Sequence, residues 1–262
     1  MNVDVEHAAA LLLEQLETGR TIPALPDGLR PATMEEAYAI QDALHRQAGW
    51  DIGVIKVGDT NPESQRNLGI DHPIGGRIPQ RRVHVTPARL DVTSFHHPPL
   101  LECEFGLRIG RPIGPDEPLD VDGIAGCVDA VVPAIEVLDT RFDVQLDVSA
   151  PSLVADNSAA AAVVLGSPVP VTSPPELVNA EVRLEVEGSV LGKGTGSAAL
   201  GDPLESLAWI VAHEQRRGRG VDAGTVVITG TCTGAIHCVL DAATVADFGP
   251  LGVVHLMIGS GS

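Results

Sequence analysis

The sequence predicts an α+β fold in which a curled, mixed β-sheet forms the core and helices lie at one side. Helical patterns dominate the first 50 residues, whereas short apolar runs separated by glycine and proline fill most of the remainder. The two patterns do not alternate as in a βαβ series, and no GxGxxG or GxxxxGK[ST] motif follows a strand pattern. We therefore expect a helical part over residues 1–50 and a sheet core over residues 51–262, which together form one functional unit.

Capping signals delimit the helices expected in the first part of the chain. The run Ala8–Leu13 lies in a first helix that Gly19 should end. A second helix should follow Thr33, because Thr33 and Glu36 have the spacing of a capping box. This helix should stop near Gly49, since glycine readily adopts the left-handed conformation that closes a helix.

The core is expected to contain one short and one long helix among its strands. A strand over Ile52–Val57 leads through a polar turn to a short helix with Pro62 in its first turn. The long helix should cover Pro203–Arg217, with Asp202 as its N-cap and Gly218 at its end.

Strands account for most of the rest of the core. Residues 69–100 are rich in Gly, Pro, Arg and His, which indicates loops and short strands. The alternating segment 183–190 predicts a hairpin that turns at Glu187-Gly188. The other predicted strands, of which the last two are expected to be buried, are Leu101–Ile109, Ala134–Leu138, Val226–Thr229 and Val253–Ile258.

Composition excludes several classes of function. A net charge of −18 argues against nucleic acid as a partner, because phosphate binding needs a basic surface. No apolar run approaches the ~20 residues of a membrane helix, so no membrane association is expected. The N-terminal segment lacks the basic start of a signal peptide, and the four cysteines are scattered. We expect reduced thiols in a cytoplasmic protein.

Three glutamates interrupt apolar runs in which a carboxylate is costly to bury. Glu102 and Glu104 would share one face of a strand, because strand side chains alternate, and Glu136 lies in a second apolar run. Three converging acids indicate a hard divalent cation with oxygen ligands, Mg²⁺ or Mn²⁺. Two simpler alternatives stay open at this point, namely that each acid faces solvent or pairs with an arginine.

Lys56 is the second candidate for chemistry. Only two lysines occur in the chain, and this one stands between Ile55 and Val57. It could be a side chain whose ammonium group reaches water at the edge of a strand. Beside a cation and partly desolvated, it would instead have a lowered pKa and could transfer a proton.

Seven stretches in the same order resemble the hydratase and decarboxylase branch of the fumarylacetoacetate hydrolase superfamily. They are residues 36–41, Lys56-Val57-Gly58 with Thr60 and Pro62, residues 68–70 with Pro73 and Gly76, Glu102-Cys103-Glu104, residues 133–141, Ala155-Asp156-Asn157 and residues 200–204. Each stretch alone is a weak signal, but seven in register over nearly the whole chain are specific.

The resemblance implies a fold, a cofactor and a reaction. The fold would be a twisted, barrel-like β-roll with a small N-terminal helical part, in a homo-oligomer. Glu102, Glu104 and Glu136 would ligate Mg²⁺ or Mn²⁺, and Lys56 would be the active-site lysine. The substrate would be a small 2-oxo acid or its dienol, so we expect a lyase, with a pathway partner enzyme as a further candidate partner.

The chain departs from the family hydratases at two positions. Ile74 stands where they carry an acid, and Ala159 stands where they carry a serine. Adding water requires a group that orients and deprotonates it, so these changes favour decarboxylation. Asp71 and Ser158 are the neighbouring residues that could substitute as catalytic groups. Asp59 replaces a residue that is apolar or small in the family, which indicates an unusual substrate.

Three further residues are candidates for substrate binding: Thr60, Arg141 and Asn157. For Arg141 we favour a structural pair with Asp139, and for Asn157 a role in orienting a loop. The cluster of Arg77, Arg81 and Arg82 could receive the distal carboxylate of a diacid, although a solvated loop is the simpler interpretation.

Two other functions compete with a lyase. A C–C hydrolase acting on an acylpyruvate would use a His–Glu pair, for which the sequence offers no good match. A catalytically inert partner subunit would not need the three glutamates and Lys56, which are all present.

Overall fold

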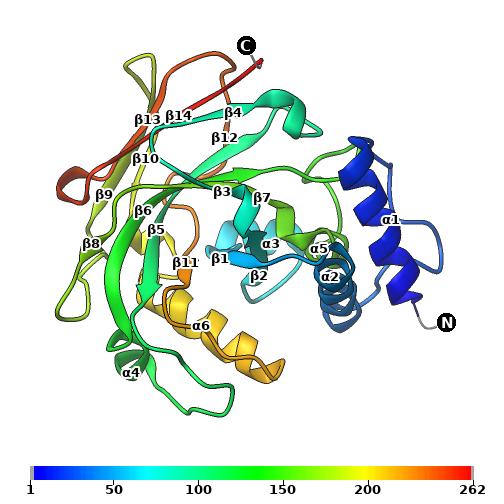
Figure 1. Ribbon diagram of the computed structural model, residues 1–262, viewed down its shortest axis with the longest axis horizontal. Coiled ribbons are helices and arrows are strands. Elements are labelled where there is room, and N and C mark those ends of the chain that lie inside the picture. The colour runs from blue at the N-terminus through cyan, green and yellow to red at the C-terminus, as the bar shows by residue number, and fades with distance from the viewer. Residues whose placement is uncertain (1–2, 261–262) are drawn as a thin grey trace.

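The computed structural model describes residues 3–260 and has the expected α+β class, with two β-sheets and helices grouped beside them (Figure 1). The larger, curled sheet has nine strands, and its main path runs β2-β1-β11-β5-β6-β7-β3. β12 and β8 pair with β5 and β6 at the side of this path. These strands are β1 (Ile52–Gly58), β2 (Ile74–Pro79), β3 (Val83–Val85), β5 (Leu100–Ile109), β6 (Val128–Leu138), β7 (Ala160–Leu165), β8 (Val169–Pro170), β11 (Val226–Ile228) and β12 (Ile236–His237).

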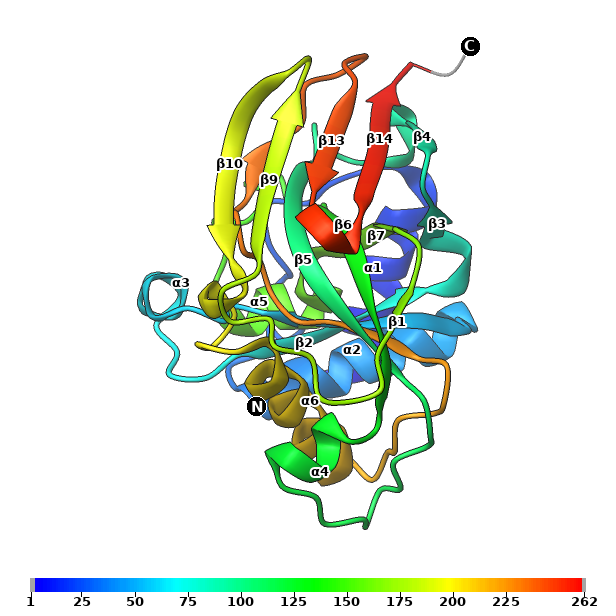
Figure 2. The ribbon, with the colours of Figure 1, turned by 90° about the vertical axis from the view of Figure 1, so that its left-hand side faces the viewer.

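The second sheet has five strands in the order β10-β9-β13-β14-β4 and stands beside the β5–β6 pair (Figure 2). Its strands are β4 (Ala88–Asp91), β9 (Glu181–Val186), β10 (Ser189–Thr195), β13 (Thr244–Asp247) and β14 (Val253–Gly259). The predicted hairpin is confirmed, because β9 and β10 are joined by Glu187 and Gly188, both with positive φ. Two such residues give the twist that a two-residue hairpin needs.

The capping signals placed four of the described helices, whereas the two short helices Val121–Ala125 and Ala150–Ala155 were not predicted. The helices are α1 (Val5–Thr18), α2 (Met34–Ala48), α3 (Pro62–Leu68), α4 (Val121–Ala125), α5 (Ala150–Ala155) and α6 (Pro203–Arg216). Gly19 and Gly49 close α1 and α2 in the left-handed conformation, and the capping box of Thr33 and Glu36 is formed. Asp202 caps α6 by accepting a hydrogen bond from the Leu204 amide. No helix within residues 3–260 is long and apolar enough to cross a membrane.

One face of β5 carries apolar side chains that pack into the main apolar core, and the opposite face carries Glu102 and Glu104. Leu101, Cys103, Phe105 and Leu107 are almost fully buried in a cluster that includes residues of the second sheet. Phe105 meets Phe248 edge-on, with ring centroids 5.4 Å apart. Burial of each large apolar side chain contributes ~1.5–3 kcal/mol, which fixes the direction in which the strand faces.

A second apolar cluster joins the N-terminal helices to the sheet core. It contains residues of α1 and α2, such as Leu12 and Leu44, together with Ile74, Leu138 and Leu153. Because residues from both parts bury one another, we propose that the helical part (residues 1–50) and the core (residues 51–262) act as one functional unit.

Two strand predictions need correction. β14 is only half buried, since Val253 is 44% exposed whereas Val254 is fully buried. This strand belongs to the smaller sheet, and its side chains alternate between core and solvent. β6 begins at Val128, six residues before the predicted start, and Pro133 lies within it. The proline is accommodated with Phe105 opposite it, and its carbonyl accepts a hydrogen bond from the Gly166 amide.

Candidate metal centre and active site

The pairing of β5 and β6 brings the three glutamates together. Glu102 lies directly opposite Glu136 in the antiparallel register, and Glu104 follows two residues later on the same face. One carboxylate oxygen from each of the three residues lies within 4.8 Å of the others. Glu104 and Glu136 are fully buried. The alternative in which each acid faces solvent is therefore wrong for these two residues.

Several of the buried carboxylate oxygens lack a hydrogen-bond partner. Glu104 accepts a hydrogen bond from the Gly230 amide at 2.6 Å through Oε2, but its Oε1 has no hydrogen-bond partner. Neither oxygen of Glu136 has one. Among the described residues, no arginine forms an ion pair with the three acids, so the second alternative is also wrong. Burial and mutual repulsion raise the pKa of Glu102 to about 8 and that of Glu104 well above its usual range.

This donor set fits a hard divalent cation. Three clustered carboxylates with unpartnered oxygens are the ligands that Mg²⁺ and Mn²⁺ prefer, and a double positive charge would offset the repulsion that raises their pKa values. Without a cation, burial and mutual repulsion favour the protonated forms of Glu102 and Glu104.

Lys56 points at this centre from β1. Its side chain is buried, and Nζ lies 3.4 Å from Glu136 Oε1. The interpretation as a side chain that reaches water at a strand edge is therefore wrong. Burial opposes the charged ammonium group, but Glu136, Glu102, Glu104 and Asp59 outweigh burial and raise the pKa of Lys56. The lowered pKa expected from the sequence does not arise from the protein groups alone.

A cavity of about 400 Å³ opens beside Lys56 and Glu102. Its walls come from β1 and the following turn, α3, β5, the end of β6, α5, the turn at residues 157–159 and two loops. The lining residues are Lys56, Gly58, Asp59, Asn61, Glu63, Ser64, Asn67, Leu68, Glu102, Leu138, Leu146, Leu153, Ser158, Ala159, Thr231, Gly234 and Ala235. This volume suits a small organic molecule.

Ser158 reaches the cavity through an unusual turn. Asn157, Ser158 and Ala159 have φ values of 56°, 53° and 58°, so three consecutive residues with side chains adopt the left-handed conformation. Ser158 Oγ donates a hydrogen bond to the Gly75 carbonyl at 2.8 Å, and Ser158 and Ala159 both line the cavity. The structure thus brings Ser158 close to Lys56, as its candidate role requires.

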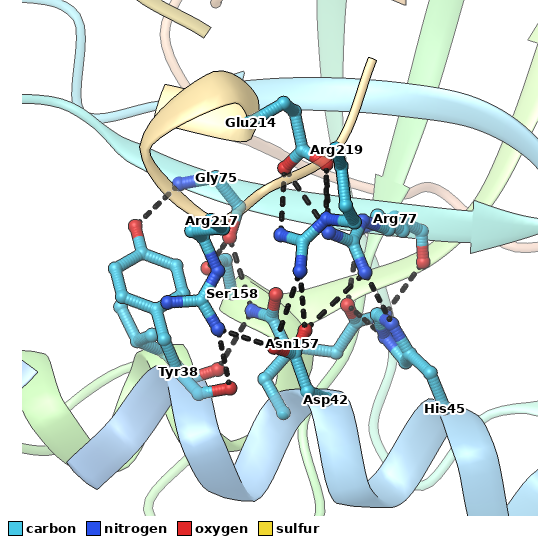
Figure 3. Close-up of polar contacts among 12 residues, drawn as sticks. Tyr38, Asp42, His45, Gly75, Arg77, Asn157, Ser158, Glu214, Arg217 and Arg219 are labelled. Carbon is cyan, nitrogen blue, oxygen red and sulfur yellow. Dashed lines mark hydrogen bonds and ion pairs between the residues drawn. The ribbon is translucent and has the colours of Figure 1, made fainter. Parts of the chain in front are cut away.

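Asn157 anchors this turn and lies outside the cavity lining. Its Oδ1 accepts hydrogen bonds from the Arg77 amide at 3.0 Å and from His45 Nε2 at 2.9 Å. Its Nδ2 donates to the Arg77 carbonyl at 2.8 Å (Figure 3). These contacts correspond to the loop-orienting role that the sequence favoured over substrate binding.

Behind the turn lies a partly buried polar cluster, formed by Asp42, His45, Arg77, Glu214, Arg217 and Arg219 (Figure 3). Arg77 binds both oxygens of Glu214 at 2.8 and 3.1 Å, and Arg219 binds the same carboxylate. Asp42, which lies on α2, pairs with Arg217 at the end of α6. Since Arg77 is fully engaged in this polar cluster, it is neither a solvated loop residue nor free to receive a substrate.

Three other candidates are not brought to the cavity. Arg141 pairs with Asp156, not with Asp139, because the chain turns after β6 toward the end of α5. It lines a separate small cavity together with Arg81 and Arg82. Its predicted role in substrate binding is therefore not supported.

Asp71 and Thr60 also lie outside the cavity lining. Asp71 is exposed in the turn before β2, where Ile74 rather than Asp71 points inward. The structure therefore gives no support to the prediction that Asp71 substitutes for the missing acid. Thr60 is buried, and a Cβ atom at Gly230 would lie only 2.3 Å from its Oγ1. The close contact between Thr60 and Gly230 thus shapes the turn in which the Gly230 amide donates a hydrogen bond to Glu104.

Sequence reasoning missed Asp59 as a site residue. Asp59 lines the cavity in the left-handed conformation, with φ of 53°, and burial raises the pKa of its carboxyl group. The signal was present in the sequence as an acid directly after the strand that carries Lys56. From the sequence alone, Asp59 is a departure from the family pattern that indicates an unusual substrate, and not a site residue.

Comparison with known proteins gives consistent matches. Residues 71–257 match the family described as fumarylacetoacetate hydrolase C-terminal. A 2-keto-4-pentenoate hydratase of Burkholderia vietnamiensis is 33% identical over 225 residues, which cover 85% of each chain. A 4-oxalocrotonate decarboxylase of Pseudomonas putida is 29% identical over 208 residues, covering 78% of this chain and 77% of that one.

Solved structures agree on the fold. The 4-oxalocrotonate decarboxylase from Pseudomonas putida G7, complexed with magnesium and adipate, superposes with a TM-score of 0.89 at 24% identity and covers 97% of each chain. A fumarylpyruvate hydrolase from Pseudomonas aeruginosa, in complex with Mn²⁺ and pyruvate, has a TM-score of 0.58 at 13% identity and covers 81% of this chain and 91% of that one.

Proposed function

The chain belongs to the fumarylacetoacetate hydrolase C-terminal family, and on this premise we propose that it is a divalent-metal-dependent lyase acting on a small 2-oxo acid or its enol or dienol. One observation carries the proposal. Three glutamates with unpartnered oxygens converge beside a buried lysine at the wall of a small cavity. The hydratase and decarboxylase relatives support the reaction class.

Glu102, Glu104 and Glu136 would hold Mg²⁺ or Mn²⁺, the cations named for the two solved relatives. The bound cation would supply a Lewis acid for the 2-oxo group, which lowers the cost of an enolate. Such an intermediate is shared by ketonisation, water addition and the loss of CO₂ from a 2-oxo-3-enedioate.

Lys56 and Ser158 are the proposed catalytic residues of the chain itself. Lys56 Nζ lines the cavity, so it can hold the substrate carboxylate while charged or give a proton to the carbon chain of an enol. Ser158 Oγ is held by the Gly75 carbonyl and is positioned to orient a ligand beside Lys56.

Decarboxylation is the first choice between the two lyase reactions. Ile74 is buried and provides no base where family hydratases carry an acid, and Ala159 provides no hydroxyl at the wall. Asp59 is the observation that favours hydration as the second candidate, because it places a carboxylate with a raised pKa in the cavity. A C–C hydrolase is less well supported, since no histidine is among the described residues that line the cavity.

The proposal is tested by incubating the protein with 2-hydroxydienoates and 2-oxo-3-enedioates in the presence of Mg²⁺, followed by mass spectrometry. Loss of CO₂ and gain of water give different product masses. A chelator should abolish turnover, and Mg²⁺ or Mn²⁺ should restore it. Turnover that is unaffected by complete chelation would contradict the proposal.

We further propose a cytoplasmic homo-oligomer that works alongside a pathway partner enzyme. Four free cysteines, three of them buried, are consistent with a reducing compartment. Light scattering of the purified protein would test the oligomeric state, and a monomeric mass at micromolar concentration would contradict it.

A further inference from the structure

Two adjacent arginines that the proposed function does not use meet at a second place on the molecule. Arg81 and Arg82 follow β2, and neither lines the cavity beside Lys56. Both line an outer cavity of about 330 Å³, a size that admits a small organic ion. Both also line an inner cavity of about 20 Å³, which shares Leu16 and Ser94 with the outer one.

Neutral groups, not acids, hold the two guanidinium groups. Arg81 lies 5.6 Å from the centroid of the Trp50 ring, and Arg82 lies 6.0 Å from that of Phe95. Arg82 also donates a hydrogen bond to the Ser94 carbonyl at 3.3 Å. Burial and the neighbouring charge of Arg81 lower the pKa of Arg82. The pair thus repels itself and leaves most of its donors without a carboxylate.

A third arginine lines the inner cavity. Arg141 is only 2% exposed, and its Nε faces Asp156, but its Nη2 is buried without a hydrogen-bond partner. A buried, unpaired donor on a charged group is costly. The inner cavity has room for about one oxygen atom of the size of water. An oxygen of a ligand placed there would supply the acceptor that Arg141 lacks.

Two acids also line these cavities. Both oxygens of Asp139 already accept hydrogen bonds, from the amides of His96 and His97 at 2.7 and 3.2 Å and from the His96 ring at 2.8 Å. Glu17 is exposed near the end of α1, so water and salt screen its charge. A ligand would therefore meet two unpaired guanidinium groups and the free donor of Arg141, opposed by one exposed carboxylate at the rim.

From this arrangement we infer that the two cavities form a binding site for a small oxyanion with two negative charges, namely inorganic phosphate or a phosphomonoester. Guanidinium groups bind such oxygens through paired, charge-assisted hydrogen bonds. Arg81 and Arg82 hold the anion in the outer cavity, and Arg141 donates to one oxygen that enters the inner cavity. None of the three lines the cavity beside Lys56, so the inference does not rest on the proposed function.

The test is titration calorimetry of the full-length protein with inorganic phosphate and with glycerol 3-phosphate, using sodium chloride of equal ionic strength as the reference. We expect saturable binding with a Kd of ~1 mM or lower, equal with and without Mg²⁺. Binding of either ligand supports the site, and the tighter ligand identifies the source of the anion. Absence of binding up to ~10 mM of both, or binding only when Mg²⁺ is present, would overturn the inference.

Variants at the cavities locate the bound anion. Arg81→Gln, at an exposed position, should weaken phosphate binding by ~10-fold or more. Glu17→Gln removes the carboxylate at the rim and should tighten binding. Arg216→Gln removes the same charge as Arg81→Gln from an exposed position on α6 that lines neither cavity, and it should leave the affinity unchanged. Equal weakening in the two arginine variants would show that overall charge binds the anion, and would also overturn the inference.

Discussion

His45 links the stability of the polar cluster to pH. The imidazole is 7% exposed, and its Nε2 lies 2.9 Å from Asn157 Oδ1, which is an acceptor, so Nε2 carries the proton. Its Nδ1 faces Arg77 Nη1 at 3.4 Å and can only accept. A second proton on the ring would be buried and would point at a guanidinium group. Burial and Arg77 therefore lower the pKa of His45 to about 4.

The sign and size of the effect follow from this pKa. The unfolded chain binds a proton below the ordinary value of 6.5, whereas the folded protein does so only near 4. The stability contributed by neutral His45 is thus fully present above 6.5 and is lost as the pH falls toward 4. Lowering the pH to about 5 should therefore cost ~2 kcal/mol of unfolding free energy through this residue.

Urea unfolding of the wild type and of His45→Gln, each at about pH 7.5 and about pH 5, isolates this contribution. Glutamine can still donate to Asn157 but does not titrate, and all other titrating groups cancel in the comparison. The variant should lose ~2 kcal/mol less than the wild type on acidification. Equal losses in the two proteins would refute the assignment of a buried, neutral imidazole.

Three further outcomes are expected. Glu136→Gln should weaken Mg²⁺ binding by at least ~10-fold in calorimetry, while the circular dichroism spectrum should be unchanged. Undiminished affinity for Mg²⁺ would show that Glu136 is not a metal ligand. Lys56→Ala should lower kcat by ~100-fold or more while Mg²⁺ still binds, and an unchanged rate would make Lys56 a packing residue. Asn157→Ala should destabilise the protein by ~1–3 kcal/mol in urea unfolding, because it leaves buried backbone groups of Arg77 unpaired. It should also lower kcat by misplacing Ser158. A variant as stable and active as the wild type would show that the turn at residues 157–159 does not depend on the Asn157 side chain.

The metal centre could be predicted because its geometry is mostly local. An ExE pattern in a strand puts both acids on one face, and the apolar neighbours on the other face determine which face packs into the main apolar core. Glu136 is different, because its place opposite Glu102 depends on the register of two strands separated by 18 residues (110–127). The sequence grouped it with the other two only because it also interrupts an apolar run, and the resemblance to a family supported that grouping.

Contacts across long separations were the ones that sequence reasoning could not assign. Arg141 has an acid two residues away in Asp139, but Asp139 accepts hydrogen bonds from the His96 and His97 amides. Arg141 pairs instead with Asp156, which a turn after β6 brings beside it. Sequence proximity therefore identified a plausible partner, while the tertiary path of the chain determined the real one.

The strained turn at residues 157–159 shows how the parts of the molecule depend on one another. Left-handed backbone costs ~1–3 kcal/mol for each residue with a side chain, and asparagine tolerates it best. The cost is offset by the hydrogen bonds of Asn157 to both backbone groups of Arg77 and of Ser158 to Gly75. Those groups lie on β2, whose neighbour β1 carries Lys56, with Gly76 directly opposite it. A Cβ atom at Gly76 would lie 2.7 Å from the Asn157 carbonyl oxygen, so the glycine lets the turn approach the strand. The polar cluster that fixes Arg77 thus also fixes the distance between Ser158 and Lys56, although none of its members lines the cavity.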